Sequence, residues 1–212
     1  MLKTILDAAA AGRFPAADGS VTVVQQPSER DAGVVAFSAH AVVFTDQDPE
    51  WVRAAVAAAP SDELAAPMNP HFLAAFADRT GRRMDTIDLL SAGSRLPGEA
   101  PLPLAPLTDR DHPRIVRALD YREDVRVWTV PGGVLILGRG LAGRWECAIE
   151  VSPEARGRGL GRDLALSARH LLPEGDHVWA QQSPGNVPSV RSFQAAGFRP
   201  VGAEALMIPR QD

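Results

Sequence analysis

Three alternating glycines, flanked by arginines, follow a predicted strand that ends at Val151. Glycine leaves backbone N–H groups unshielded by a side chain, and the row consists of Gly157, Gly159 and Gly161. The loop leads into a predicted helix, whose dipole is positive at this end. Further positive charge comes from Arg156, Arg158 and Arg162. This pattern predicts an anion site for a phosphate or pyrophosphate; a tight turn without a ligand is the simpler alternative.

Two common phosphate-binding motifs are absent from this loop. A nucleotide P-loop requires Gly-Lys-Ser/Thr at the start of the helix, and the only lysine of the chain is Lys3. A dinucleotide fingerprint would require glycine where Arg162 stands, within a parallel βαβ unit. The sequence therefore argues against both cofactor classes.

The run Arg156-x-x-Gly159-x-Gly161 resembles the acetyl-CoA pyrophosphate motif of the GNAT (general N-acetyltransferase) superfamily. A second motif follows in the expected order, reading Asn186-x-x-Ser189-x-x-x-Phe193-x-x-x-Gly197-Phe198. It resembles the helix and turn that come after the fifth strand of that family. The resemblance covers about residues 101–212, roughly half of the chain.

The resemblance implies how acetyl-CoA would be held. The sheet would open after Val151, whose main chain would pair with the pantetheine arm like an extra strand. The pyrophosphate would lie on the loop Arg156, Gly157, Arg158, Gly159, Leu160, Gly161 and Arg162. Asn186 and Ser189 would face the pantetheine or the thiol end. Asn186 is also a natural helix N-cap, and both roles are compatible.

Acyl transfer to an amine needs a base that takes a proton from the ammonium. In the predicted strand 144–151, alternation places Glu146 and Glu150 on one face. Both glutamates are candidates, Glu146 first because it lies in mid-strand and Glu150 second. The simpler alternative for each is a solvated charge on an exposed sheet face.

The family's usual proton donor to the leaving thiolate is a tyrosine, and Phe193 stands at that position. The only tyrosine of the chain is Tyr121, which could reach the site; water could also serve. Cys147 lies on the face opposite the glutamates and is expected to be a packed core residue rather than a nucleophile. The five histidines lack metal-ligand spacing, so we expect no metal.

These features predict an N-acetyltransferase that moves an acetyl group from acetyl-CoA to a primary amine of a small molecule or peptide. A catalytically silent acyl-CoA-binding module is one alternative. A transferase of the same fold that takes its acyl group from aminoacyl-tRNA is another. The identity of the amine is not encoded in a recognisable pattern, because acceptor pockets are built from variable loops.

The expected fold of the C-terminal half is α+β, with a mixed, mostly antiparallel sheet flanked by helices. Three antiparallel strands are predicted at 125–130, 134–137 and 143–151, followed by a helix at 159–172. A strand at 178–182, a helix at 187–196 and a pair of strands after Phe198 complete it. A helix at 109–119 precedes these elements.

The N-terminal half, residues 1–100, is expected to be a separate α/β region, with the GNAT domain at 101–212. A helix at 1–12, a strand at 21–25, a hairpin at 33–45 and helices capped by Asp48 and Asn69 are predicted. Because a hairpin followed by a helix imitates the other half, this region could be a degenerate GNAT-like copy. The proline-rich segment 91–106 is the expected linker or edge segment.

The composition fits a soluble cytoplasmic protein. Of 212 residues, 45% are hydrophobic and the net charge is −4, which argues against disorder and against general nucleic-acid binding. A single cysteine excludes an intramolecular disulfide. Asp7 interrupts the first apolar run, so we expect neither a signal peptide nor a membrane span. The oligomeric state is left open, a homodimer included.

Overall fold

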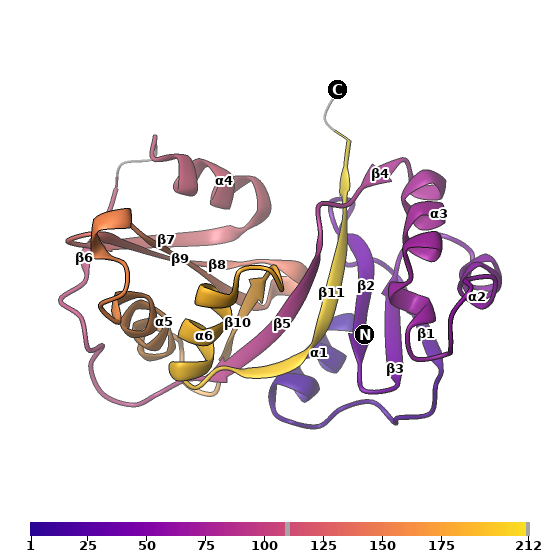
Figure 1. Cartoon of the computed structure of the whole chain (residues 1–212), viewed down its shortest axis with the longest axis horizontal. Helices are drawn as coiled ribbons and strands as arrows, with labels where there is room; N and C mark the ends of the chain where they lie inside the picture. Colours follow the sequence, from indigo (N-terminus) through magenta and orange to yellow (C-terminus); the bar gives the residue numbers. More distant parts are fainter. Residues whose placement is uncertain (109–110, 211–212) are drawn as a thin grey trace. The chain divides into compact units, whose positions relative to one another are not determined.

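The computed structural model describes residues 1–108 and 111–210 (Figure 1). Its residues form two compact units, each described here by itself. The first unit consists of two segments, Met1–Leu90 and the segment from Val201 onward, and the second unit is Ser91–Pro200. These bounds differ from the predicted division at residue 100. The last strand, β11 (Arg199–Pro209), pairs antiparallel with β2 (Ala32–Phe37), so the end of the chain belongs to the first unit.

The first unit contains a mixed sheet. The predicted hairpin is present, with β2 antiparallel to β3 (His40–Phe44). The strand β1 (Val21–Val24) runs parallel to β3, and the short β4 (Arg82–Arg83) pairs with β11. The expectation of a hairpin followed by a helix is met here, whereas the origin of this unit as a second GNAT-like copy stays a prediction.

Helices of the first unit begin where the sequence predicts caps. Helix α2 (Pro49–Ala57) begins after Asp48, whose side chain accepts from the Glu50 N–H. Helix α3 (Pro70–Thr80) begins in the same way after Asn69. The remaining helical segments are α1 (Leu2–Ala10) and η1 (Ala66–Met68). Apolar side chains of α2 and α3 pack with β2 and β3 in one buried core.

Two predicted features differ in the structure. The segment after Phe198 forms the single strand β11 rather than the predicted pair of strands. Residues 91–94 belong to the strand β5 (Ile87–Ser94) rather than to a linker, because the prolines begin only at Pro97.

The second unit contains the predicted antiparallel strands. They are β7 (Glu123–Val130), β8 (Gly133–Arg139) and β9 (Trp145–Val151), with η2 (Leu141–Gly143) between the last two. The short β6 (Ala105–Pro106) pairs with β7, as expected of an edge segment. Strand β10 (His177–Gln182) runs parallel to β9.

Helices cover both faces of this sheet. Helices α5 (Leu160–His170) and α6 (Val187–Ala195) pack on the face that carries Leu135 and Leu137. Helix α4 (Pro113–Tyr121) packs on the other face, against Val127 and Ile136. The arrangement confirms the predicted α+β class with a mixed, mostly antiparallel sheet. In the described ranges, no helix is long and apolar enough to cross a membrane.

Candidate functional site

The site begins where two parallel strands part. Strands β9 and β10 are in register at only two positions, Trp145 with Val178 and Glu146 with Trp179. Beyond Glu146, β9 continues to Val151 without β10 beside it in register. The two strands therefore diverge and leave one edge of β9 open.

The direction of the β9 backbone follows from its other neighbour. The Ser152 N–H donates to the Gly132 carbonyl oxygen at 2.9 Å, and Gly133 lies opposite Val151. Paired and unpaired positions alternate along an antiparallel ladder, so the N–H and C=O of Val151 point away from β8. Those of Ile149, two residues earlier, point the same way. The open edge thus presents a row of backbone donors and acceptors to a ligand.

The glycine loop connects this edge to α5. After η3 (Pro153–Ala155), Gly157 and Gly159 take φ values of 74° and 85°, in the left-handed region that favours glycine. Helix α5 begins without a side-chain cap. Its first helical bond runs from the Asp163 N–H to the Gly159 oxygen, so the three preceding N–H groups have no intrahelical acceptor. This helix end is the place where the sequence predicts an anion site.

Gly161 is needed for close packing rather than for a turn. A Cβ at this position would lie 3.2 Å from Ser192 Oγ and 3.7 Å from a Val151 methyl group. The absence of that Cβ lets α5, α6 and the end of β9 meet around one space. Glycine is therefore favoured at 157 and 159 by the backbone conformation and at 161 by the tight contact with Ser192.

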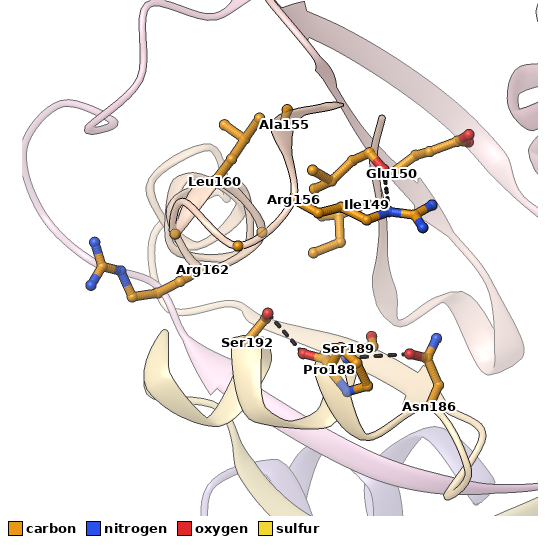
Figure 2. Close-up of a pocket in the computed structure, with 14 residues that line it drawn as sticks. Ile149, Glu150, Ala155, Arg156, Leu160, Arg162, Asn186, Pro188, Ser189 and Ser192 are labelled. Carbon is orange, nitrogen blue, oxygen red and sulfur yellow. Dashed lines mark hydrogen bonds between the residues drawn. The ribbon is translucent and has the colours of Figure 1, made fainter. Parts of the chain in front are cut away.

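A cavity of about 780 Å³ lies between the end of β9, the glycine loop and the start of α6 (Figure 2). All the predicted cofactor-binding residues except the exposed Arg158 line it. Those that do are Val151, Arg156, Gly157, Gly159, Leu160, Gly161, Arg162, Asn186 and Ser189. The arginine side chains differ in their contacts, because Arg156 Nε donates to the Val151 oxygen at 3.2 Å whereas Arg162 pairs with Asp163.

Sequence reasoning missed four further lining residues. They are Ile149, Ala155, Pro188 and Ser192. A signal existed for two of them: Ser192 follows Ser189 by three residues on the same helix face, and Ile149 precedes Val151 by two on the same strand face. No such signal marks Pro188 and Ala155, which line the cavity because the backbone passes beside it at these positions.

Asn186 caps α6, which is the N-cap role that the sequence predicts for it. Its Oδ1 accepts from the Ser189 N–H at 3.3 Å. On the next turn, Ser192 Oγ donates to the Pro188 oxygen at 2.9 Å. These bonds fix the start of α6 opposite the glycine loop.

The surroundings of Glu146 argue against its predicted role as the base. The residue is only 4% exposed, and both carboxylate oxygens accept from arginines: Arg144 Nε at 2.8 Å and Arg122 Nε at 3.1 Å. Burial alone would raise the pKa of Glu146, but the two guanidinium charges and their hydrogen bonds hold it below its ordinary value. A carboxylate held in this way is a weak proton acceptor.

Glu150 lies at the cavity. It is half-buried on the open part of β9, and its side chain points away from Ile149, on the opposite side of the strand (Figure 2). Tyr121, at the end of α4 beneath Arg117, is not among the cavity-lining residues. Of the predicted catalytic residues, the structure therefore brings only Glu150 to the cavity.

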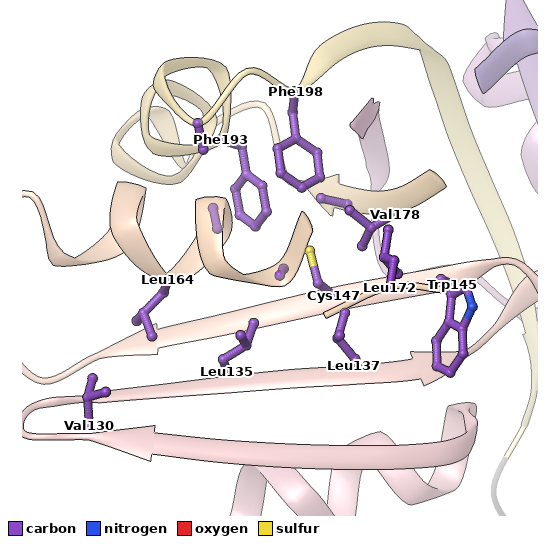
Figure 3. Packing of buried hydrophobic residues seen from close by; sticks show 14 residues of the cluster. Val130, Leu135, Leu137, Trp145, Cys147, Leu164, Leu172, Val178, Phe193 and Phe198 are labelled. Atoms are coloured by element: carbon purple, nitrogen blue, oxygen red, sulfur yellow. The ribbon is translucent and has the colours of Figure 1, made fainter. Parts of the chain in front are cut away.

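Phe193 and Cys147 belong to the core of the second unit (Figure 3). The Phe193 ring meets Phe198 edge-on with centroids 4.9 Å apart, and only 4% of the residue is exposed. Burial raises the pKa of the Cys147 thiol to about 12, which fits the expected packing role. In the part of the chain that the structure describes, no cluster of histidine, cysteine or acidic residues could hold a metal ion.

Comparison with protein families bears on this same region. Residues 147–206 match the FR47-like protein family model. This segment is related to the GNAT superfamily. The predicted resemblance is thereby confirmed for residues 147–206, a range that includes the glycine loop, α6 and both GNAT-like motifs. No curated protein matches the chain.

Solved structures of GNAT proteins are similar to part of the chain. A GCN5-related N-acetyltransferase from Kribbella flavida is 19% identical, with a TM-score of 0.43 over 66% of this chain and 64% of its own. An acetyltransferase from Colwellia psychrerythraea is 10% identical, with a TM-score of 0.41 over 66% and 63%. One from Novosphingobium aromaticivorans is 19% identical, with a TM-score of 0.36 over 62% and 69%. The chain thus spans less than two thirds of the first two.

Proposed function

We propose that this protein is an N-acetyltransferase that transfers the acetyl group of acetyl-CoA to a primary amine by direct attack. The observation that carries the proposal is the open edge of β9 beside an uncapped helix start, both lining one cavity. An extended amide chain that ends in a pyrophosphate matches this pair of features. The FR47-like match over the same residues supports it.

The donor substrate fits the residues that line the cavity. Its pyrophosphate would accept from the N–H groups at the start of α5, with Arg156 adding positive charge. The pantetheine amides would pair with the backbone N–H and C=O of Ile149 and with the N–H of Val151, whose C=O already accepts from Arg156 Nε. A Cβ at Gly161 would intrude on the space between α5 and α6, which agrees with a cradle shaped for a ligand.

Glu150 is the proposed general base, in place of Glu146. Its carboxylate would take a proton from the ammonium of the acceptor, directly or through a water molecule. The amine nitrogen then attacks the thioester carbon, and a backbone N–H near Val151 would hold the developing oxyanion. As the C–S bond breaks, the nitrogen gives its second proton to solvent water and the thiolate takes a proton from water, so that the amide and free CoA are released.

Titration calorimetry with acetyl-CoA, followed by an assay of free CoA release over a panel of primary amines, tests the proposal. We expect binding in the micromolar range and release that depends on the amine. Glu150→Gln should lower turnover about 100-fold or more while leaving the acetyl-CoA affinity nearly unchanged. Glu154→Gln is the matched control, because Glu154 is exposed and does not line the cavity. Absence of acetyl-CoA binding would overturn the proposal.

A catalytically silent acyl-CoA-binding module is the second candidate. The observation that favours it is the placement of Phe193 in the core and of Tyr121 away from the cavity lining, which leaves no tyrosine there as a proton donor. Acetyl-CoA binding without CoA release for any amine of the panel would support this candidate over the enzyme.

A further inference from the structure

Glu146 is the centre of a buried polar cluster that links four segments of the second unit. Besides the two arginines, its Oε1 accepts from the Leu141 N–H at 3.2 Å and from Gln181 Nε2 at 3.3 Å. Arg122 follows α4, Leu141 and Arg144 lie in the connection from β8 to β9, and Gln181 belongs to β10. One carboxylate therefore holds groups from both sides of the β9–β10 pairing.

The backbone around the cluster leaves room for these side chains. Gly138 lies opposite Glu146 in the β8–β9 ladder, and a Cβ on it would lie 2.9 Å from the Arg122 Cβ. A Cβ on Gly140 would lie 2.2 Å from the carboxyl carbon of Glu146. A side chain at either position would overlap the charged cluster, so both glycines are needed for the ion pairs of Glu146 to form.

The cluster lies at the point where the strands part. Glu146 and Trp179 form the last pair in register between β9 and β10. Gln181 is two residues farther along β10, on the same face as Trp179, and its amide reaches back to Glu146. The Arg144 guanidinium lies over the Trp179 ring, 5.0 Å from its centroid. These contacts hold β10 against β9 at the last paired position, just before the two strands diverge.

We propose that Glu146 is a positioning residue that fixes the point and the width of the separation between β9 and β10. This inference rests on the proposed function, because the separation is where the acyl-pantetheine arm would lie. Glu146 acts on that arm through Gln181 and the strand backbone, and it does not exchange a proton with the substrate. The nucleotide half of the donor contacts α5 and is independent of this cluster.

Two probes distinguish a positioning role of Glu146 from a role as the base or a general role in folding. They are acetyl-CoA and the adenosine bisphosphate half of coenzyme A, which lacks pantetheine. Gln181→Leu removes the bond that crosses the separation and keeps both arginine ion pairs. We expect it to raise the Kd of acetyl-CoA about tenfold, as for one hydrogen bond to a charged group, with the Kd of the nucleotide changed less than twofold. Gln194→Leu, on the exposed end of α6, is the matched control and should change neither.

Glu146→Gln addresses the competing role as a base. If Glu146 is a positioning residue, Glu146→Gln should weaken the binding of acetyl-CoA but not that of the adenosine bisphosphate. The acidic limb of the pH profile of kcat/KM should remain. A loss of that limb with unchanged acetyl-CoA binding would overturn the inference. Equal weakening of both probes in Gln181→Leu, together with a lower Tm, would also overturn it, since that marks a general folding role. If the wild-type protein binds neither probe, the proposed function itself fails.

Discussion

Arg156 donates a hydrogen bond from Nε to the main-chain oxygen of Val151, at 3.2 Å, and so joins the glycine loop to the open edge of β9. Arg156 lines the cavity, whereas Arg158, two residues later, does not, although both residues are exposed. We expect Arg156→Ala to weaken acetyl-CoA binding about tenfold at low salt, because a charge-assisted contact is lost. Calorimetry at two salt concentrations measures this loss, which should shrink as salt screens the charge.

Arg158→Ala is the matched control for Arg156→Ala, because it removes the same charge from the same loop. We expect less than a threefold change in the Kd of acetyl-CoA. Equal losses for the two variants would contradict the assignment, since they would indicate a diffuse attraction by the loop rather than a contact made by Arg156.

The contact between Gly161 and Ser192 gives a second prediction. Gly161→Ala places a methyl group 3.2 Å from Ser192 Oγ, which is held by the Pro188 oxygen, so the Ser192 side chain must give way by a few tenths of an ångström and strain that bond. We expect weaker acetyl-CoA binding and a lower Tm. Adding Ser192→Ala should restore much of both, because the nearest remaining atom, the Cβ, lies at 3.6 Å. A double variant no better than Gly161→Ala alone would show that the contact is not the cause.

The glycine loop could be predicted from the sequence because its requirements are local. Positive φ at Gly157 and Gly159 and an uncapped helix start follow from residue types within seven positions. The role of Glu146 could not be predicted in this way. Alternation gives the face on which its side chain lies, but the partners that bury and neutralise it include Arg122 and Gln181, which lie 24 and 35 residues away.

The same distinction applies to the fold. The caps at Asp48 and Asn69 and the three antiparallel strands depend on neighbouring residues and were predicted. The pairing of β11 with β2 joins residues more than 160 positions apart, and no local pattern near Phe198 encodes it.

A pH-dependent stability is predicted for the first unit. Burial, with the charges of Glu204 and Asp85, raises the pKa of Asp88 from 3.8 to about 6. The folded state therefore binds more protons than the unfolded state between these values, and stability falls as the pH rises from about 4 to about 6. Asp88→Asn should remove this fall and raise the free energy of unfolding at pH 7.5 by about 1 kcal/mol, a value reduced for solvent screening at a half-buried site.

Thermal unfolding of wild type and Asp88→Asn at several pH values between about 3.5 and 8 measures this effect. The two curves of Tm against pH should converge toward the acidic end and separate above about 6. Asp78→Asn is the control, because Asp78 is exposed and its pairing with Arg210 is solvated. Parallel curves for Asp88→Asn and wild type would rule out Asp88 as the group that titrates.

Phe193 offers a test of how the thiolate is protonated. In Phe193→Tyr, the hydroxyl would enter the core between α6 and the sheet, where the ring packs edge-on against Phe198. A buried hydroxyl without a partner costs about 1 to 3 kcal/mol, so we expect a lower Tm and no gain in turnover. Phe193→Leu, which adds no polar group, controls for the loss of the ring contact. A tenfold rise in CoA release at unchanged Tm would show instead that residue 193 reaches the thioester and that water is not the proton donor.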